Sequence, residues 1–129
     1  MKWIVVFLMV LSCEAATFDQ FCAALAKVES SGNPKAYNVK EKAIGLYQIR
    51  PAYFKDAQEY DKDLARFSHR DCYNPQVAKR VVWAYLSRYG AKDVESMARL
   101  HNAGPAWGSK MRATDGYWQK IKKNLTSNP

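Results

Sequence analysis

The feature that most constrains the fold is the spacing of apolar side chains, which recur every three or four residues in five stretches of the chain. Such spacing places them on one face of an α-helix. In the first stretch Thr17 and Gln20 form a capping box, and Gly32 and Pro34 follow as stop signals. The later stretches begin near Pro51, Asn74, Asp93 and Thr114.

Strand signals are scarce, so the sequence predicts a mainly α protein. The segment from Tyr37 to Ile44, between the first two stretches, fits an irregular loop or a short hairpin. The strongest helix start is Asn74-Pro75, because Asn caps a helix and Pro suits its first position. No repeat or linker interrupts residues 16–129, which predicts a single compact domain.

Residues 1–15 have the pattern of a signal peptide. Lys2 precedes an apolar run from Trp3 to Leu11, and small residues up to Ala15 suit a cleavage site. The run is shorter than the roughly 20 residues that span a bilayer. We therefore expect a secreted or periplasmic protein without stable membrane insertion. A buried N-terminal strand is an alternative, and residues 10–13 loosely resemble a lipobox, in which Cys13 would carry lipid.

With Cys13 in the leader, Cys22 and Cys72 remain as an even pair. A chain addressed to an oxidising compartment usually pairs such cysteines. The sequence therefore predicts a disulfide that closes a loop of about fifty residues and stabilises the fold by roughly 3–4 kcal/mol.

The chain is basic, with 20 Lys and Arg against 12 Asp and Glu, a net charge of +8. An exported basic domain favours an anionic partner outside the cell, such as a bacterial wall. No nucleic-acid signature is present, so we do not expect a nucleic-acid partner. Because His69 and His101 lack companion ligands, we expect no metal and no cofactor, and the protein is expected to be a monomer.

Glu29 is the candidate general acid. It follows Leu25 by four residues and so continues the apolar face of the first helix. Burial and the negative end of the helix dipole both disfavour a carboxylate there, which predicts a raised pKa. A general acid that works near neutral pH needs such a carboxyl group. The alternative is a solvated Glu at a frayed helix end or one paired with an Arg.

Three blocks of sequence support the enzymatic interpretation. Residues 29–34 read ESSGNP, residues 43–51 read AIGLYQIRP and residues 100–105 read LHNAGP. In this order they resemble the lytic transglycosylase and goose-type lysozyme-like family, whose pattern is Glu-Ser-Ser, then Gly-Leu-Met-Gln-Ile, then Ala-Tyr-Asn-Ala-Gly. The resemblance covers nearly all of residues 16–129 and implies a lysozyme-like fold.

The resemblance also implies site residues and a substrate, the glycan strands of peptidoglycan. Glu29 would protonate the oxygen between N-acetylmuramic acid and N-acetylglucosamine. Ser31, Gly45, Gln48 and Asn102 would bind substrate in the cleft. Three of them have a plainer alternative: Gly45 could be a turn residue, Gln48 could cap a helix and Asn102 could end one.

Two positions depart from the family pattern. His101 replaces the family's Tyr, which helps to hold the substrate and the catalytic Glu, and Tyr47 replaces its Met. His101 could donate the same hydrogen bond, and its titration would add a second pH dependence. The alternative is a structural histidine with satisfied hydrogen bonds. We include both residues among those expected to bind substrate.

The sequence leaves the reaction outcome open. A lytic transglycosylase uses one Glu and forms a 1,6-anhydro product, whereas a lysozyme enlists water. Glu41 is the candidate second acid that would hold this water, although it could equally pair with Lys40 or Lys42 on the surface. Two other functions remain open: a glycan-binding protein that uses the same cleft without cutting, and a basic antimicrobial that acts on membranes.

Overall fold

The protein is mainly helical, as the sequence predicts. In this computed structural model residues 17–126 are described, and residues 17–30 form the first helix. The predicted leader at residues 1–15 and Cys13 lie outside the described residues. The elements that follow are β1 (Tyr37–Asn38), β2 (Ala43–Ile44), α2 (Pro51–Tyr60), the 3₁₀ turns η1 (Lys62–Arg66) and η2 (His69–Tyr73), α3 (Pro75–Arg88), α4 (Val94–Ala103), the 3₁₀ turn η3 (Trp107–Ser109) and α5 (Met111–Thr126).

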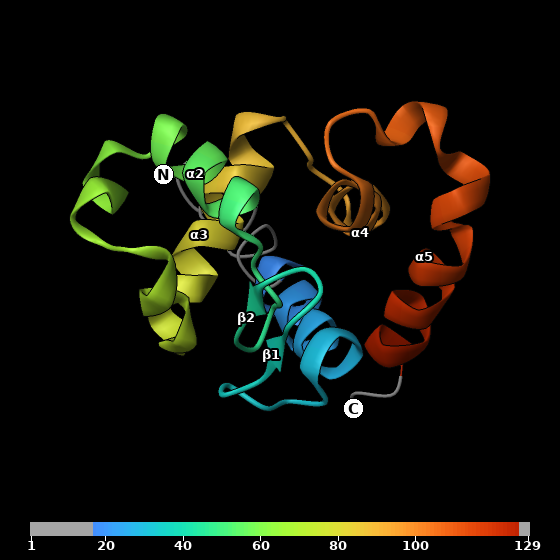
Figure 1. Ribbon diagram of the computed structural model, residues 1–129. Coiled ribbons are helices and arrows are strands. Elements are labelled where there is room, and N and C mark those ends of the chain that lie inside the picture. Colours follow the sequence, from blue (N-terminus) through green and yellow to red (C-terminus); the bar gives the residue numbers. More distant parts are fainter. Residues whose placement is uncertain (1–16, 127–129) are drawn as a thin grey trace, which may run out of the picture.

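The first helix lies at the centre of the molecule. In Figure 1 it runs between α2 and α3 on one side and α4 and α5 on the other. Its residues Phe21, Ala24 and Leu25 are completely buried and belong to the hydrophobic core. The core therefore surrounds the element that carries Glu29.

Local signals set the helix starts where the sequence predicts them. The Asn74 side chain accepts a hydrogen bond from the Gln76 amide at 2.9 Å, and Asp93 accepts one from the Ser96 amide at 2.7 Å. Both satisfy amides that a helix start leaves unpaired. The last helix begins at Met111, three residues before the expected Thr114. Thr114 lies within its first turn instead, and its hydroxyl donates to the carbonyl of Lys110, which precedes the helix.

The first helix ends in a left-handed turn. Ser31 and Gly32 have φ values of 55° and 78°. Their amides donate back to the carbonyls of Lys27 and Ala26, both at 3.1 Å. These two bonds satisfy carbonyls of the last turns, which a helix end would otherwise leave without partners. Glu29 therefore stands on a helix end with a fixed geometry.

The segment from Tyr37 to Ile44 is a two-stranded antiparallel hairpin, in which Tyr37 pairs with Ile44 and Asn38 with Ala43. The loop that follows folds back so that Ile44 and Ile49 exchange hydrogen bonds of 3.1 and 3.0 Å. The Ser30 hydroxyl donates to the Leu46 carbonyl at 2.8 Å. This bond fastens the loop to the end of the first helix.

The predicted disulfide is wrong: Cys22 and Cys72 are both free and buried. Each packs in the core as a small apolar side chain. Burial raises the pKa of each thiol to about 12, so both keep their protons. Because the thiolate is the reactive form, neither side chain is set up for exchange.

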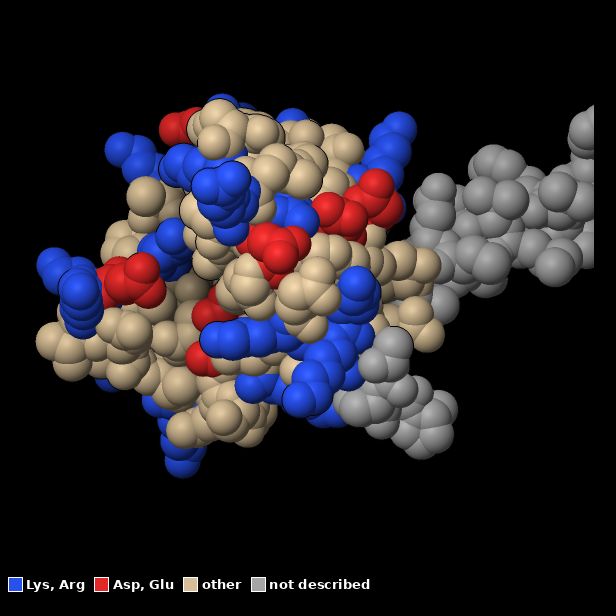
Figure 2. All heavy atoms as spheres, turned by 90° about the vertical axis from the view of Figure 1, so that its right-hand side faces the viewer, with Lys and Arg blue, Asp and Glu red and all other residues tan. Residues whose placement is uncertain are grey.

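Basic side chains are spread over the surface rather than gathered in one stripe. Figure 2 shows the side of the molecule that carries α5, where Lys and Arg are interspersed with fewer Asp and Glu. Within residues 17–126, no helix combines the length and the apolar character that crossing a membrane requires.

Gly45 provides the first testable prediction. Its φ is 81°, and a Cβ at this position would lie 2.4 Å from the Cys72 carbonyl oxygen. We expect Gly45→Ala to destabilise the protein by about 2–4 kcal/mol, because strain and overpacking add. Chemical unfolding measures the loss.

Gly116→Ala is the matched control, since nothing lies within 4 Å of a Cβ built at Gly116 inside α5. We expect this variant to be more stable by roughly 0.5–1 kcal/mol, from helix propensity alone. Equal stability changes in the two variants would contradict the close approach at Gly45.

Candidate active site

Glu29 lies at the end of the first helix, where its side chain is 21% exposed. The Tyr117 hydroxyl donates a hydrogen bond of 2.6 Å to its Oε2 atom. The Nε2 atom of His101 lies 3.5 Å from the same oxygen. One carboxyl group therefore joins the first helix, α4 and α5, and keeps limited access to solvent.

The environment of Glu29 raises its pKa above the ordinary value. Burial is the largest cause, and the nearby charge of Glu41 acts in the same direction. The Tyr117 hydrogen bond and the positive charge of Arg50 oppose it by stabilising the carboxylate. The net effect favours the protonated form relative to an ordinary Glu, as a general acid requires.

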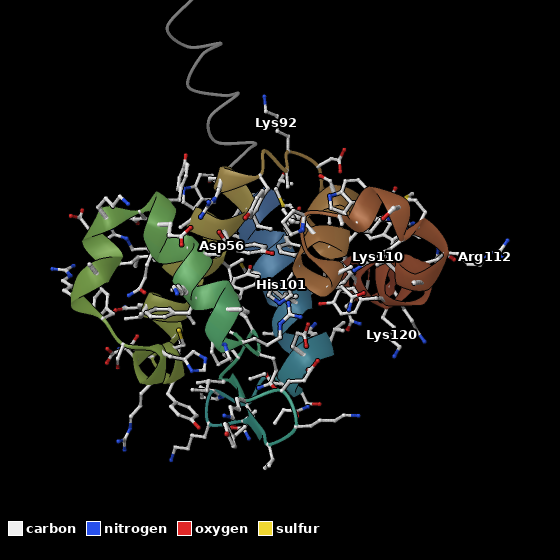
Figure 3. The ribbon with its side chains drawn as sticks, turned by 45° about the horizontal axis from the view of Figure 1, so that its top comes forward. Asp56, Lys92, His101, Lys110, Arg112 and Lys120 are labelled. Atoms are coloured by element: carbon white, nitrogen blue, oxygen red, sulfur yellow. The ribbon has the colours of Figure 1, made fainter. Side chains whose placement is uncertain are left out.

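His101 is buried in a network that fixes its ring. Figure 3 shows it near the centre of the molecule. Its Nε2 atom lies 3.0 Å from the Tyr47 carbonyl oxygen, which can only accept, so Nε2 carries the proton. Its Nδ1 atom then accepts from the Tyr53 hydroxyl at 2.9 Å. Tyr53 is buried as well, so its ring is not a platform for sugar.

The His101 ring is neutral. Burial, aided by the charge of Arg50, lowers its pKa to about 3. The contact with Glu29 is therefore between a neutral N–H group and a carboxyl group, and it is not an ion pair. The second pH dependence expected near neutrality from His101 is wrong, because the ring does not titrate there.

Tyr117 is the site residue that the sequence analysis missed. It is a phenol that contacts Glu29 and comes from α5. The apolar face of the last helix includes Tyr117, so its spacing indicated only a core residue. No local signal connects it with a residue 88 positions earlier.

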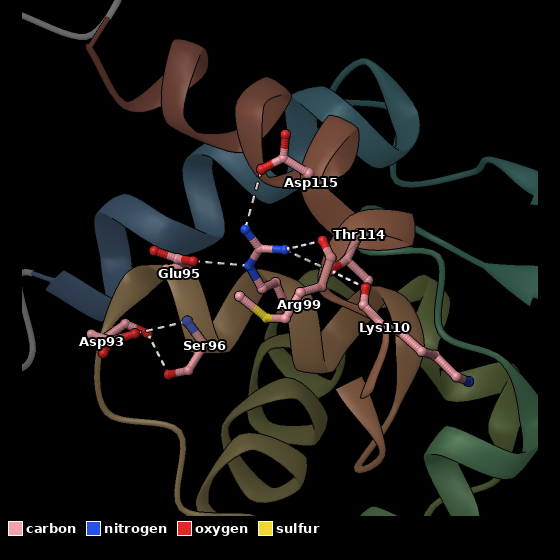
Figure 4. Close-up of polar contacts among 8 residues, drawn as sticks. Asp93, Glu95, Ser96, Arg99, Lys110, Thr114 and Asp115 are labelled. Atoms are coloured by element: carbon pink, nitrogen blue, oxygen red, sulfur yellow. Dashed lines mark hydrogen bonds and ion pairs between the residues drawn. The ribbon is translucent and has the colours of Figure 1, made fainter. Parts of the chain in front are cut away.

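A buried arginine holds α5 in place. Arg99 is 4% exposed, and its guanidinium donates to the Met111 carbonyl at 2.7 Å and to the Thr114 hydroxyl at 2.8 Å (Figure 4). It also bonds to Glu95 and, at 3.3 Å, to Asp115. These contacts fix the helical turn just before Tyr117.

Three of the six predicted binding residues have their side-chain or backbone contacts within the loop or with the core beside it. The Gln48 side chain donates to the carbonyls of Ala36 and Gly45 at 3.3 and 3.0 Å. The close neighbour of Gly45 is the Cys72 backbone. The Tyr47 ring is buried beside Cys22, so only its carbonyl reaches the site.

The remaining predicted residues are exposed. Ser31 lies in the turn after Glu29, and Asn102 follows His101 on the last turn of α4. Glu41 lies in the turn of the hairpin, where its amide donates to the Asn38 side chain at 3.1 Å. Its negative charge is the smallest of the influences on the pKa of Glu29 and raises it.

A pocket of about 290 Å³ opens between α2, α3 and the turn after α4. Arg50, just before α2, and Tyr53 in α2 line it, and Tyr85 lines it from α3. Arg50 also donates a hydrogen bond of 3.0 Å to the His101 carbonyl. The pocket is therefore a neighbour of the Glu29 site.

Comparison with known proteins identifies the family. A family model described as Destabilase matches residues 19–124. The chain belongs to the Destabilase family. It is 35% identical over 111 residues to Invertebrate-type lysozyme 6 of Caenorhabditis elegans, covering 76% of this chain and 80% of the relative. It is 32% identical over 117 residues to Lysozyme of Magallana gigas, covering 84% and 81%.

The lysozyme-like single domain expected from the sequence is confirmed by this membership and by the helical architecture. The narrower resemblance to lytic transglycosylases and goose-type lysozymes is not confirmed, because the matched family is Destabilase.

The neutral state of His101 predicts how stability depends on pH. The ordinary pKa of 6.5 applies in the unfolded chain, and the folded value is about 3. Between these values only the unfolded chain takes up the proton. We therefore expect His101 to lower the free energy of unfolding by about 1.4 kcal/mol per pH unit as pH falls through this window.

Urea unfolding of the wild type and of His101→Gln between pH 7 and pH 4 measures this slope. Gln can donate and accept a hydrogen bond but does not titrate in this range. We expect the slope of the unfolding free energy against pH to be smaller in the variant, by the contribution of about one proton. Equal slopes would show that His101 titrates normally in the folded protein.

Proposed function

We propose that this protein is a muramidase that hydrolyses the β-1,4 bond between N-acetylmuramic acid and N-acetylglucosamine in peptidoglycan. The observation that carries the proposal is the half-buried Glu29 carboxyl with its raised pKa and its Tyr117 and His101 contacts. Both relatives are named as lysozymes, which supports the same chemistry.

In the proposed reaction the protonated Glu29 gives its proton to the glycosidic oxygen. The carboxylate that remains is stabilised by the Tyr117 hydroxyl and by the charge of Arg50, which favour this form. The group can then act as a base in the second half of the reaction. The neutral His101 ring lies against the same oxygen while its one N–H group donates to the Tyr47 carbonyl, so it adds no charge.

Glu41 is the proposed second carboxyl group. It lies on the hairpin, is exposed, and is close enough for its charge to influence Glu29. A carboxylate there would hold a water molecule or stabilise the developing positive charge of the sugar. This role favours hydrolysis over formation of a 1,6-anhydro sugar.

The surroundings in which the protein works are also part of the proposal. The leader pattern of residues 1–15 favours export, and the net charge of +8 favours association with an anionic cell wall. Both support an enzyme that meets its substrate outside the cell that makes it.

The first test replaces the proposed acid. Glu29→Gln keeps the shape but removes the proton, so we expect clearing of a cell-wall suspension to slow by a factor on the order of 10²–10⁴. Glu59→Gln is the matched control, since Glu59 is exposed at the end of α2 and pairs with Arg88. It should clear walls at the wild-type rate.

Mass spectrometry of the released fragments identifies the reaction. We expect reducing ends, as hydrolysis requires. Fragments with 1,6-anhydro ends would show that the reaction is transglycosylation rather than hydrolysis, and the acid role of Glu29 would stand. Binding to walls without any released fragment would favour the glycan-binding alternative, and a fully active Glu29→Gln would remove the acid role.

The second test concerns Tyr117. Its hydrogen bond lowers the pKa of Glu29, so Tyr117→Phe should raise that pKa further. Because the acid must be protonated, we expect the alkaline limb of the kcat/KM profile to move to higher pH. Tyr60→Phe, on an exposed ring at the end of α2, is the control. A limb that stays in place or moves to lower pH would contradict the role of the hydroxyl.

A further inference from the structure

The pocket beside the active site carries hydrogen-bond donors with spare capacity. Tyr85 is 4% exposed, and its ring stacks on Tyr53 with the centroids 3.7 Å apart. Within residues 17–126 its hydroxyl makes no hydrogen bond, yet every fully buried side-chain oxygen or nitrogen there has a partner. The hydroxyl is therefore open to the pocket that Tyr85 lines.

The position of Gly104 supports this placement. Gly104 also lines the pocket, and a Cβ built on it would meet the Tyr85 hydroxyl oxygen at 3.8 Å. The hydroxyl thus faces the turn after α4 across the pocket. A buried ring with an unused O–H group is a group that a ligand can satisfy.

Arg50 supplies a second donor and a positive charge. It is partly buried, and among the described residues it forms no ion pair. One of its N–H groups donates to the His101 carbonyl, and a guanidinium has five. The acid of the pocket, Asp56, is already engaged by Arg88 and by the Tyr89 hydroxyl at 2.6 Å.

We propose that this pocket binds a carboxylate carried by the glycan strand. Arg50 would pair with the carboxylate and the Tyr85 hydroxyl would donate to it, while Ala103 and Pro105 offer apolar contacts to a neighbouring methyl group. The proposal rests on the muramidase function, because it names a feature of the same substrate.

The carboxylate has two sources in peptidoglycan. In strands without peptides it is the free lactyl group of muramic acid, and in intact strands it belongs to the stem peptide. A volume of about 290 Å³ suits one such substituent rather than a run of sugars. Strands of N-acetylglucosamine alone carry no carboxylate, so the pocket would distinguish peptidoglycan from chitin.

Binding measurements test the proposal without turnover. All variants are made in the Glu29→Gln background, and calorimetry gives the Kd for three ligands: a chito-oligosaccharide, peptide-free glycan strands and peptide-bearing strands. We expect Tyr85→Phe to reduce the preference for carboxylate-bearing strands over the chito-oligosaccharide about tenfold. Ala103→Leu, which fills the pocket, should do the same.

Tyr60→Phe makes the same chemical change on an exposed ring and should leave all three Kd values unchanged. Thermal unfolding verifies that each variant is folded at the assay temperature. A loss confined to peptide-free strands assigns the lactyl carboxylate, and a loss confined to peptide-bearing strands assigns the stem.

Equal weakening of all three ligands, or none, would overturn the proposal. Its failure can be told apart from that of the proposed function, which depends on whether the protein with Glu29 intact releases glycan fragments. A protein that cuts walls but shows no Tyr85 effect keeps the muramidase function and loses the carboxylate site.

Discussion

The site depends on the partial burial of one carboxyl group at the end of the central helix. Burial alone would keep Glu29 protonated, and exposure alone would keep it ionised. Tyr117 and Arg50 favour the carboxylate while burial and Glu41 favour the acid, so neither form dominates through a single interaction. The rest of the fold positions these groups, which come from the hairpin, the start of α2, and α5.

The sequence predicts those parts of the fold that have local causes. Asn74 and Asp93 start helices by bonding to amides two or three residues ahead, and Pro51 opens α2, so a short segment contains the whole signal. Glu29 could be selected in the same way, since its place on the apolar face and near the helix end follows from spacing. The three sequence blocks that resemble a known family then suggested which residues lie near Glu29, which helical spacing alone does not predict.

What the sequence did not predict depends on contacts between distant segments. Tyr117 looks like a core residue, and only the packing of α5 brings it to Glu29. Gln48 and Gly45 look like binding residues, but their contacts lie within the loop and with Cys72. The disulfide was predicted from the oxidising compartment in which the protein was expected to fold. That rule does not show whether two particular thiols are in contact.

The carboxyl group stands on the first helix, whereas the phenol that completes its surroundings stands on the last one. A nascent chain that emerges from the ribosome thus carries the acid long before it carries the acid's partner. The proposed site can therefore form only after α5 has been synthesised and has docked against the first helix. A fragment that ends before α5 would lack the Tyr117 contact with Glu29.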